Sequence, residues 1–139
     1  MNKILKRVLI GLGVLIALLL IAFPILRNQT KKASPEQTAS QSYGAAQATV
    51  AYSSPSKRER VIFGELVPFG EVWRTGANEA TTFVSTGDLM IGGQTLPAGE
   101  YTLWTIPGPT EWTVIWNKKD YFWGVASGAK ASRDPEFDV

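Results

Sequence analysis

The chain has 139 residues, with 14 Lys and Arg against 12 Asp and Glu, and it contains neither histidine nor cysteine. The two absences exclude serine–histidine and thiol catalysis, disulfides, and metal sites built on His or Cys ligands. Basic side chains are concentrated at the start of the chain. Residues 1–48 contain six basic residues and one acidic residue, whereas residues 49–139 contain eight basic and eleven acidic residues. Because the part able to fold is mildly acidic, we expect no nucleic-acid partner.

An uncharged, mostly apolar run covers residues 8–26, after three basic residues near the start of the chain. As a helix, its nineteen residues would be about 28 Å long, close to the roughly 30 Å hydrocarbon core of a bilayer. Twelve of residues 8–23 are Leu, Ile, Val or Phe, which favours insertion by roughly 4–7 kcal/mol. Residues 1–27 are therefore predicted to be a single transmembrane anchor. A cleaved signal peptide is the alternative, although no Ala-x-Ala cleavage site follows directly.

Three basic residues lie on each side of the predicted span, so their number alone does not orient it. We expect the short N-terminal flank to stay in the cytoplasm and the C-terminal part to be exported. Residues 28–48 are rich in Gln, Ser, Thr and Ala, and they are predicted to form a flexible polar linker with a reach of about 25 Å.

Residues 49–139 are predicted to form an all-β domain. No segment has helical periodicity, and short runs of β-branched and aromatic residues alternate with Gly and Pro. Seven strands are predicted, over residues 49–52, 60–63, 80–85, 89–91, 94–96, 100–106 and 112–117. A two-residue turn at Gly92 and Gly93 joins the fourth strand to the fifth. This spacing predicts an antiparallel β-sandwich of jelly-roll or immunoglobulin-like type, or a partial barrel.

One predicted hairpin has a five-residue turn at residues 107–111 and pairs Trp104 with Val114. Period-two alternation then places Trp104, Trp112 and Trp116 on one face of the sheet. Two interpretations are open. Either the tryptophans form the core, or they form an exposed platform that stacks on sugars or apolar ligands.

A second group of candidate ligand-binding residues lies in the Gly-rich stretch 64–81 and consists of Trp73, Arg74, Asn78 and Glu79. The polar members either converge on a ligand or support the loop, with Arg74 paired to a carboxylate and Asn78 in the left-handed conformation. No catalytic residue and no cofactor is predicted. No metal site is predicted either, because the alternating acids at 134, 136 and 138 lack the Gly-turned loop of a calcium site.

Five segments of the domain form a distinctive pattern. They read Ser-Ser-Pro-Ser-Lys-Arg (53–58), Gly-Glu-Leu-Val-Pro-Phe-Gly (64–70), Val-Trp-Arg-Thr-Gly-Ala-Asn-Glu-Ala-Thr (72–81), Leu-Pro-Ala-Gly-Glu-Tyr (96–101) and Trp-Thr-Val-Ile (112–115). Together they resemble the bacterial domain of unknown function 2911 (DUF2911) over residues 49–139. The resemblance implies a bacterial, exported, β-rich domain behind a signal sequence or anchor, and it brings no established activity or site.

Members of that family are expected to continue past the position of residue 139 into further strands. We therefore expect this chain to be a C-terminally shortened sandwich that lacks the strands needed to close its sheet. Such a domain exposes unpaired backbone along one strand. The expectation that follows is self-association through an open sheet edge.

These features favour a membrane-tethered domain of the bacterial inner membrane, with the N-terminus in the cytoplasm and the C-terminal domain in the periplasm or outside. The domain is expected to bind a small-molecule or protein ligand without catalysis. The first alternative is a carboxylate-based hydrolase of envelope or carbohydrate substrates, with Glu79 paired to Asp88, Asp120 or Glu65. The second is a structural module of an envelope complex, which requires an exposed apolar patch without a cavity.

Overall fold

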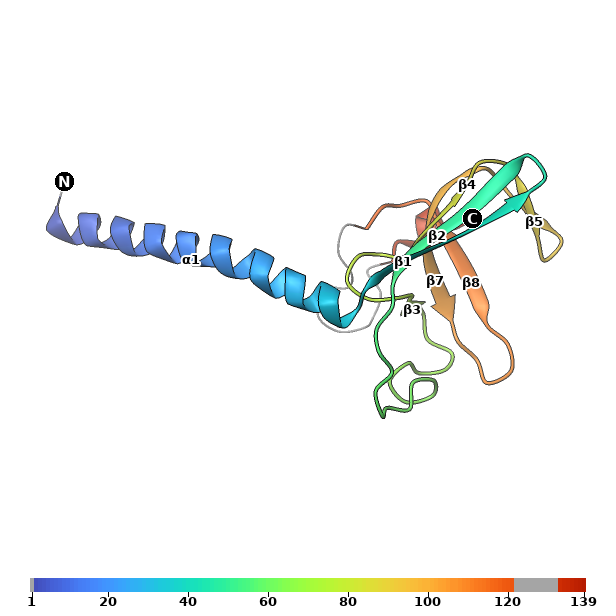
Figure 1. The fold of residues 1–139 in the computed structure, drawn as a ribbon, viewed down its shortest axis with the longest axis horizontal. Coiled ribbons are helices and arrows are strands. Elements are labelled where there is room, and N and C mark those ends of the chain that lie inside the picture. The colour runs from blue at the N-terminus through green and yellow to red at the C-terminus, as the bar shows by residue number, and fades with distance from the viewer. Residues whose placement is uncertain (1, 122–132) are drawn as a thin grey trace. The chain divides into compact units, whose positions relative to one another are not determined.

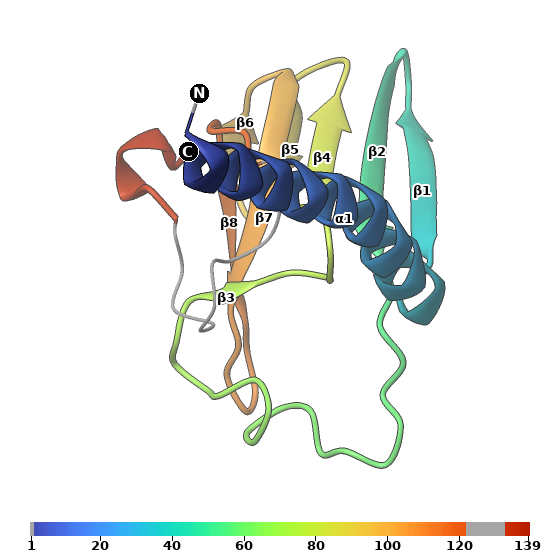
Figure 2. The same cartoon turned by 90° about the vertical axis from the view of Figure 1, so that its left-hand side faces the viewer.

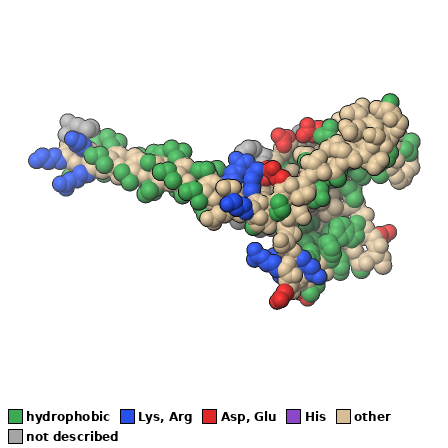
Figure 3. All heavy atoms as spheres, in the orientation of Figure 1, with side chains coloured by type: hydrophobic (Ala, Val, Ile, Leu, Met, Phe, Trp, Pro, Cys, Tyr) green, Lys and Arg blue, Asp and Glu red, His purple; other side chains and the backbone are tan. Residues whose placement is uncertain are grey.

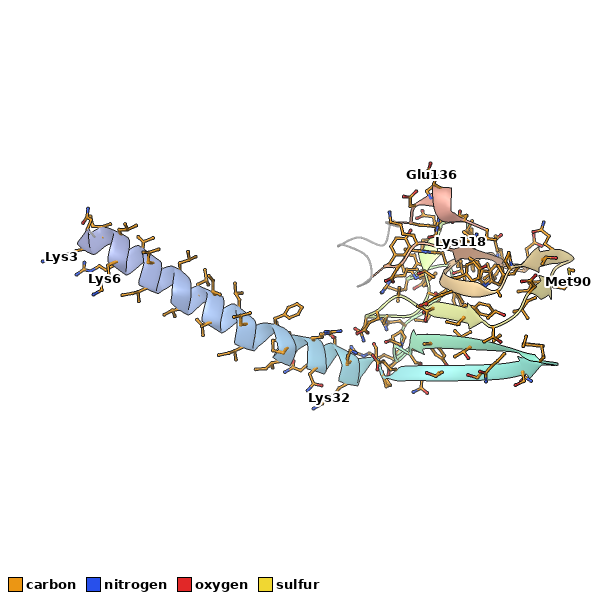
Figure 4. All side chains as sticks on the ribbon, turned by 90° about the horizontal axis from the view of Figure 1, so that it is seen from above. Lys3, Lys6, Lys32, Met90, Lys118 and Glu136 are labelled. Atoms are coloured by element: carbon orange, nitrogen blue, oxygen red, sulfur yellow. The ribbon has the colours of Figure 1, made fainter. Side chains whose placement is uncertain are left out.

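The computed structural model describes residues 2–121 and 133–139, which belong to two units: a helix, and a β domain that begins at Ser34 (Figure 1). Helix α1 runs over Lys3–Ala33 and is about 46 Å long at 1.5 Å per residue. Its many Leu and Ala residues are strong helix formers, and two lysines in its last turn complement the helix dipole. Apolar side chains project along α1 between Lys6 and Lys32 in Figure 4. Within the described residues, α1 alone is long and apolar enough to span a membrane, a property that signal sequences share.

The second unit is built from antiparallel strands. Their bounds are β1 Glu36–Tyr43, β2 Ala46–Ser53, β3 Trp73–Arg74, β4 Thr82–Ser85, β5 Leu89–Ile91, β6 Gln94–Leu96, β7 Gly99–Ile106 and β8 Thr113–Asn117. Six of the strands form one open sheet, and β5 and β6 form a separate hairpin. Figure 2 shows β1, β2, β4, β7 and β8 side by side in that order. The prediction of a mostly β, antiparallel domain behind an apolar N-terminal helix is confirmed, and its sheets are open.

Strand β7 organises the sheet because it pairs with three other strands. Strand β8 pairs with β7 residues 102–106, so it occupies one edge of β7. Strands β4 and β3 pair with residues 99–102 and 104–105, so both must share the opposite edge. The chain between them, residues 75–81, is held at the gap: Leu103 N donates to Thr81 O (2.9 Å), and Thr75 Oγ1 donates to Leu103 O (2.7 Å). The Gly-rich loop is therefore fastened to the most central strand.

The core lies on both faces of β7. Tyr101 and Trp104 are 2% and 1% exposed, and since they are three residues apart on a strand their side chains point to opposite faces. The Tyr101 hydroxyl donates to Pro97 O (2.7 Å), while the Trp104 ring packs edge-on against Tyr121 with centroids 5.3 Å apart. Burial, and secondarily the charge of Asp88, raise the pKa of Tyr101. A strand that is buried on both faces makes a rigid support for the loops at its ends.

The predicted register of the β7–β8 hairpin is wrong by one residue. Trp104 pairs with Ile115, and Val114 pairs with Thr105. The connection takes six residues, 107–112, where the sequence suggested five. A one-residue slip moves every side chain of one strand to the other face. Trp104 therefore lies on the face opposite Trp116, and the three tryptophans form no common platform.

The predicted flexible linker over residues 28–48 is also wrong, because helix α1 continues to Ala33 and strand β1 fills residues 36–43. Strand β1 pairs with β2 along its whole length, from Glu36 opposite Ser53 to Tyr43 opposite Ala46. Every side chain of β1 is exposed, so main-chain pairing holds the strand and no apolar pattern marks it. The predicted strand over residues 60–63 is absent, apart from an isolated bridge between Phe63 and Val67.

The described C-terminal residues lie along β8. Val139 N donates to Trp116 O (2.9 Å), and a short 3₁₀ turn, η1 over Pro135–Phe137, precedes this contact. The Lys119 ammonium lies 3.1 Å from an Asp134 carboxylate oxygen and is the largest cause that lowers the pKa of Asp134. Two of the alternating acids of this segment thus bind protein groups: Asp134 binds Lys119, and Asp138 accepts from the Asn117 amide.

Candidate functional site

A cavity of about 440 Å³ lies between the loop of residues 54–72, strand β3 and the β7–β8 turn. We call it the Trp112 pocket. It is lined by Pro55, Ser56, Lys57, Arg60, Ile62, Phe63, Leu66, Val67, Trp73, Arg74, Thr75, Gly76, Thr105 and Trp112. The loop and the turn lie at the same end of the domain in Figures 1 and 2, where Gly70 N donates to Pro107 O (2.8 Å). Figure 3 shows hydrophobic side chains gathered on this lower part of the domain, beside Lys and Arg side chains.

Exposed apolar side chains form the mouth of the Trp112 pocket. Phe63 is 53% exposed, Leu66 45% and Trp112 46%. The Phe63 and Trp112 rings meet edge to face, with centroids 4.8 Å apart and an interplanar angle of 76°. Exposed apolar clusters of this kind mark sites that bind other molecules. The sequence analysis named Trp112 as a candidate but missed Phe63 and Leu66, because it assigned residues 60–63 to a strand.

A tight turn presents Phe63 and Leu66. Val67 N donates to Ile62 O (2.8 Å), Gly64 N donates to Val67 O (2.9 Å), and Val67 itself is buried. Gly64 has φ +90°, and a Cβ there would lie 3.0 Å from the Phe69 ring, so only glycine fits this turn without strain. The conformation of this turn therefore keeps the side chains of Phe63 and Leu66 exposed.

The charged groups that line the Trp112 pocket are all basic: Lys57, Arg60 and Arg74. The Arg60 guanidinium donates to Lys57 O (3.2 Å) and Ser56 O (2.9 Å), which folds the loop around it. Arg74 is half-buried on β3, and its Nη1 donates to Asn78 O (2.8 Å). Burial lowers the pKa of the Arg74 guanidinium. The site is thus apolar at its mouth and positive in its wall.

The Gly-rich run that follows Arg74 serves as support. Asn78 has φ +56°, in the left-handed conformation anticipated for it, and its amide donates to Ser34 O (3.2 Å). The partner of Arg74 is the Asn78 main-chain carbonyl instead of the expected carboxylate. Gly76 has φ +73°, and a Cβ on it would lie 2.7 Å from Thr81 Oγ1. These constraints fix the backbone that positions Arg74.

The structure brings three of the seven predicted site residues together, since Trp73, Arg74 and Trp112 all line the Trp112 pocket. Trp104 lies in the core, and Trp116 is half-buried with its ring edge-on to Phe83, centroids 6.2 Å apart. Asn78 supports the loop as described above. Glu79 lines a separate cavity of about 260 Å³.

Two of the carboxylates proposed as partners of Glu79, Asp88 and Asp120, do not line its cavity. Glu79 shares its cavity with Glu36, whereas Asp120 lines another cavity of about 170 Å³. The Asp88 carboxylate accepts a hydrogen bond from Ala98 N (2.8 Å) beside the β5–β6 hairpin. Within residues 2–121 and 133–139, no group of three or more acidic side chains is placed to hold a metal ion.

Comparison with known proteins identifies the domain. Residues 34–139 match the model of a family described as "Protein of unknown function (DUF2911)". The match covers most of the chain and confirms the resemblance, but it starts fifteen residues before the predicted boundary at residue 49 and so includes β1. Neither the curated proteins nor the solved structures include one that matches this chain. The chain belongs to the DUF2911 family.

Proposed function

We propose that this DUF2911 domain is a binding module that takes an apolar small molecule into the Trp112 pocket and performs no chemistry on it. The observation that carries the proposal is the exposed cluster of Phe63, Leu66 and Trp112 around a cavity of about 440 Å³. Ligand pockets typically occupy about 300–1,000 Å³ and are lined mainly by apolar and aromatic groups. An exposed apolar surface without a cavity would instead favour a structural module.

The absence of catalysis in this proposal rests on the kinds of side chain that line the Trp112 pocket. Its lining residues include no carboxylate, so it lacks the paired acids that a glycosidase needs. The chain has no histidine or cysteine that could act as base or nucleophile there. The remaining polar side chains are positioned to bind and orient.

We further propose that α1 is an uncleaved anchor that holds the domain on the periplasmic side of the bacterial inner membrane. Support comes from its length of about 46 Å, which exceeds a bilayer core, and from the basic residues before and after its apolar run. Membrane fractions should retain the full chain through high-salt and alkaline washing and release it only with detergent. A soluble form that begins after Leu26 would contradict the anchor.

The binding proposal can be tested on the full chain labelled with 5-fluorotryptophan and reconstituted in nanodiscs of zwitterionic lipid. Each fluorine resonance is assigned by a Trp→Phe variant. The neutral probe 2-naphthylmethanol should shift the resonances of Trp112 and Trp73 and leave that of buried Trp104 unchanged. Empty nanodiscs correct for partitioning of the probe into lipid.

A pair of variants controls for general apolar binding. Leu66→Asp places a charge at the pocket mouth and should abolish the shifts at Trp112. Met90→Asp introduces the same charge at a 70% exposed apolar residue of the β5–β6 hairpin and should leave binding intact. Equal behaviour of the two variants would refute a binding site in the Trp112 pocket.

A further inference from the structure

We infer that the ligand of the Trp112 pocket is an amphipathic carboxylate, whose anionic group binds Arg74 and whose apolar part contacts Phe63, Leu66 and Trp112. This inference rests on the binding function proposed above and specifies the chemical class of the ligand. Aromatic acids and fatty acids share this chemistry.

The first step is the position of Arg74. Strand β3 is only two residues long, and it places Arg74 opposite Trp104, the most deeply buried side chain of β7. Arg74 is half-buried there and is one of the residues that line the Trp112 pocket. Because its backbone is paired to the central strand, Arg74 has little freedom to leave the cavity.

The second step is the charge balance at this guanidinium. Arginine carries five N–H donors and a permanent positive charge. Over the described part of the chain, Arg74 has one hydrogen-bond partner, the Asn78 carbonyl, and no carboxylate within ion-pair distance. A carbonyl satisfies a donor but leaves the charge uncompensated. Taking such a charge out of water is unfavourable unless an anion pairs with it.

The third step is that the charged residues around the cavity favour a negatively charged ligand. Lys57 lines the same cavity from the loop, and the cavity lining contains no Asp or Glu to compete for the cations. A carboxylate suits Arg74 in particular, because two parallel N–H donors of a guanidinium match its two oxygens. A cationic ligand would meet only repulsion there.

The fourth step is that apolar groups dominate the rest of the lining. The hydroxyl of Thr75 already donates to Leu103 O (2.7 Å) and is not free for a ligand. Three exposed apolar side chains stand at the mouth instead, two of them in edge-to-face contact. The combination of an apolar mouth and an uncompensated cation in the wall fits one molecule with an apolar body and an acidic group.

The test uses probes that share one ring system and differ in charge, with the fluorinated full chain in nanodiscs. We expect 2-naphthoate to bind about tenfold more tightly than 2-naphthylmethanol, as a hydrogen-bonded charge pair predicts, and 2-naphthylmethylammonium to bind more weakly than either. Octanoate serves as the second arm. Tighter binding of octanoate identifies a fatty-acid-like ligand, and tighter binding of naphthoate an aromatic acid.

Two variants assign the effect to Arg74. Arg74→Met should remove the preference for naphthoate over the alcohol, whereas Lys118→Met, which removes an exposed cation outside the pocket, should preserve it. Near-ultraviolet circular dichroism reports whether Arg74→Met remains folded, and the comparison of probes on the unaltered chain requires no variant.

The two proposals fail in different ways. If the alcohol and naphthoate bind equally well, the pocket binds ligands but the inferred class is wrong. If no probe shifts the Trp112 resonance, the binding function itself is refuted.

Discussion

Replacing Asn117 with alanine should destabilise the β domain more than any change at the surface. Its side chain is completely buried at the end of β8 and forms four hydrogen bonds. The amide nitrogen donates to Asp134 O (2.7 Å) and Asp138 Oδ1 (2.8 Å). The amide oxygen accepts from Lys119 N (3.0 Å) and from the Tyr121 hydroxyl (3.3 Å). One side chain thus links β8 to the C-terminal segment.

The expected cost follows from these bonds. At about 1 kcal/mol for each hydrogen bond, Asn117→Ala should lower the free energy of unfolding by about 4 kcal/mol. For a domain of this size, about 4 kcal/mol corresponds to a fall in Tm of at least about 15 °C. Tyr121→Phe removes two bonds, to Asn117 Oδ1 and from Asp134 N, and should cost about half as much.

Thermal unfolding of the full chain in a mild non-ionic detergent, followed by near-ultraviolet circular dichroism, measures these differences. Gln94→Ala, at an exposed position of β6, is the control and should change Tm by only a degree or two. A cost below about 1 kcal/mol for Asn117→Ala would refute the argument that this network fixes the C-terminal segment.

Two further predictions concern the backbone. Gly76→Ala should cost about 3 kcal/mol and Gly92→Ala about 1 kcal/mol. Both glycines have positive φ, but a Cβ at Gly76 would collide with Thr81, whereas a Cβ at Gly92 would meet no other atom. Equal Tm values for the two variants would contradict this explanation. We also propose that β1, which among the described strands pairs only with β2, binds β1 of a second copy. Since the chain has no cysteine, Ala39→Cys should form disulfide-linked dimers in membranes, and Met90→Cys should not; equal crosslinking would exclude this edge.

The sequence predicted correctly those strands that are marked by an adjacent turn and by alternation of their own side chains. Strands β5 and β6 coincide with the predicted segments, because the Gly92–Gly93 turn between two apolar runs fixes both of their inner ends. Strand β7 differs by one residue, and β8 begins one residue later than predicted. In each case the alternation of side chains and the nearby turn carry the necessary information.

Strand β1 shows what local patterns cannot supply. Its sequence, Glu-Gln-Thr-Ala-Ser-Gln-Ser-Tyr, buries no side chain, and the strand exists because β2 offers a complete edge of hydrogen-bonding groups. Composition therefore indicated a linker. Strand β3 presents the same difficulty on a smaller scale, since its two residues are a strand only through pairing with β7.

The candidate site depends on such non-local contacts. Trp73, Arg74 and Trp112 were identified by residue type. A difference of one residue in the length of a turn, however, decides that Trp104 and Trp116 lie on opposite faces of the sheet. Phe63 and Leu66 resemble ordinary core residues in the sequence, and only the Gly64 turn shows that they are held out of the core.

The residues whose burial or pairing differs from the usual pattern are also those that support the proposed function. A stable fold normally buries Phe63, Leu66 and Trp112 and gives a half-buried arginine an acidic partner. At one end of this domain the three apolar side chains are exposed and the arginine has no acidic partner among the described residues. Its central strand is nevertheless buried on both faces and could support a conventional core. Departures from local rules that meet around one cavity are expected where a protein binds another molecule. The uncompensated Arg74 is the sharpest of these departures, and it gives the ligand its predicted charge.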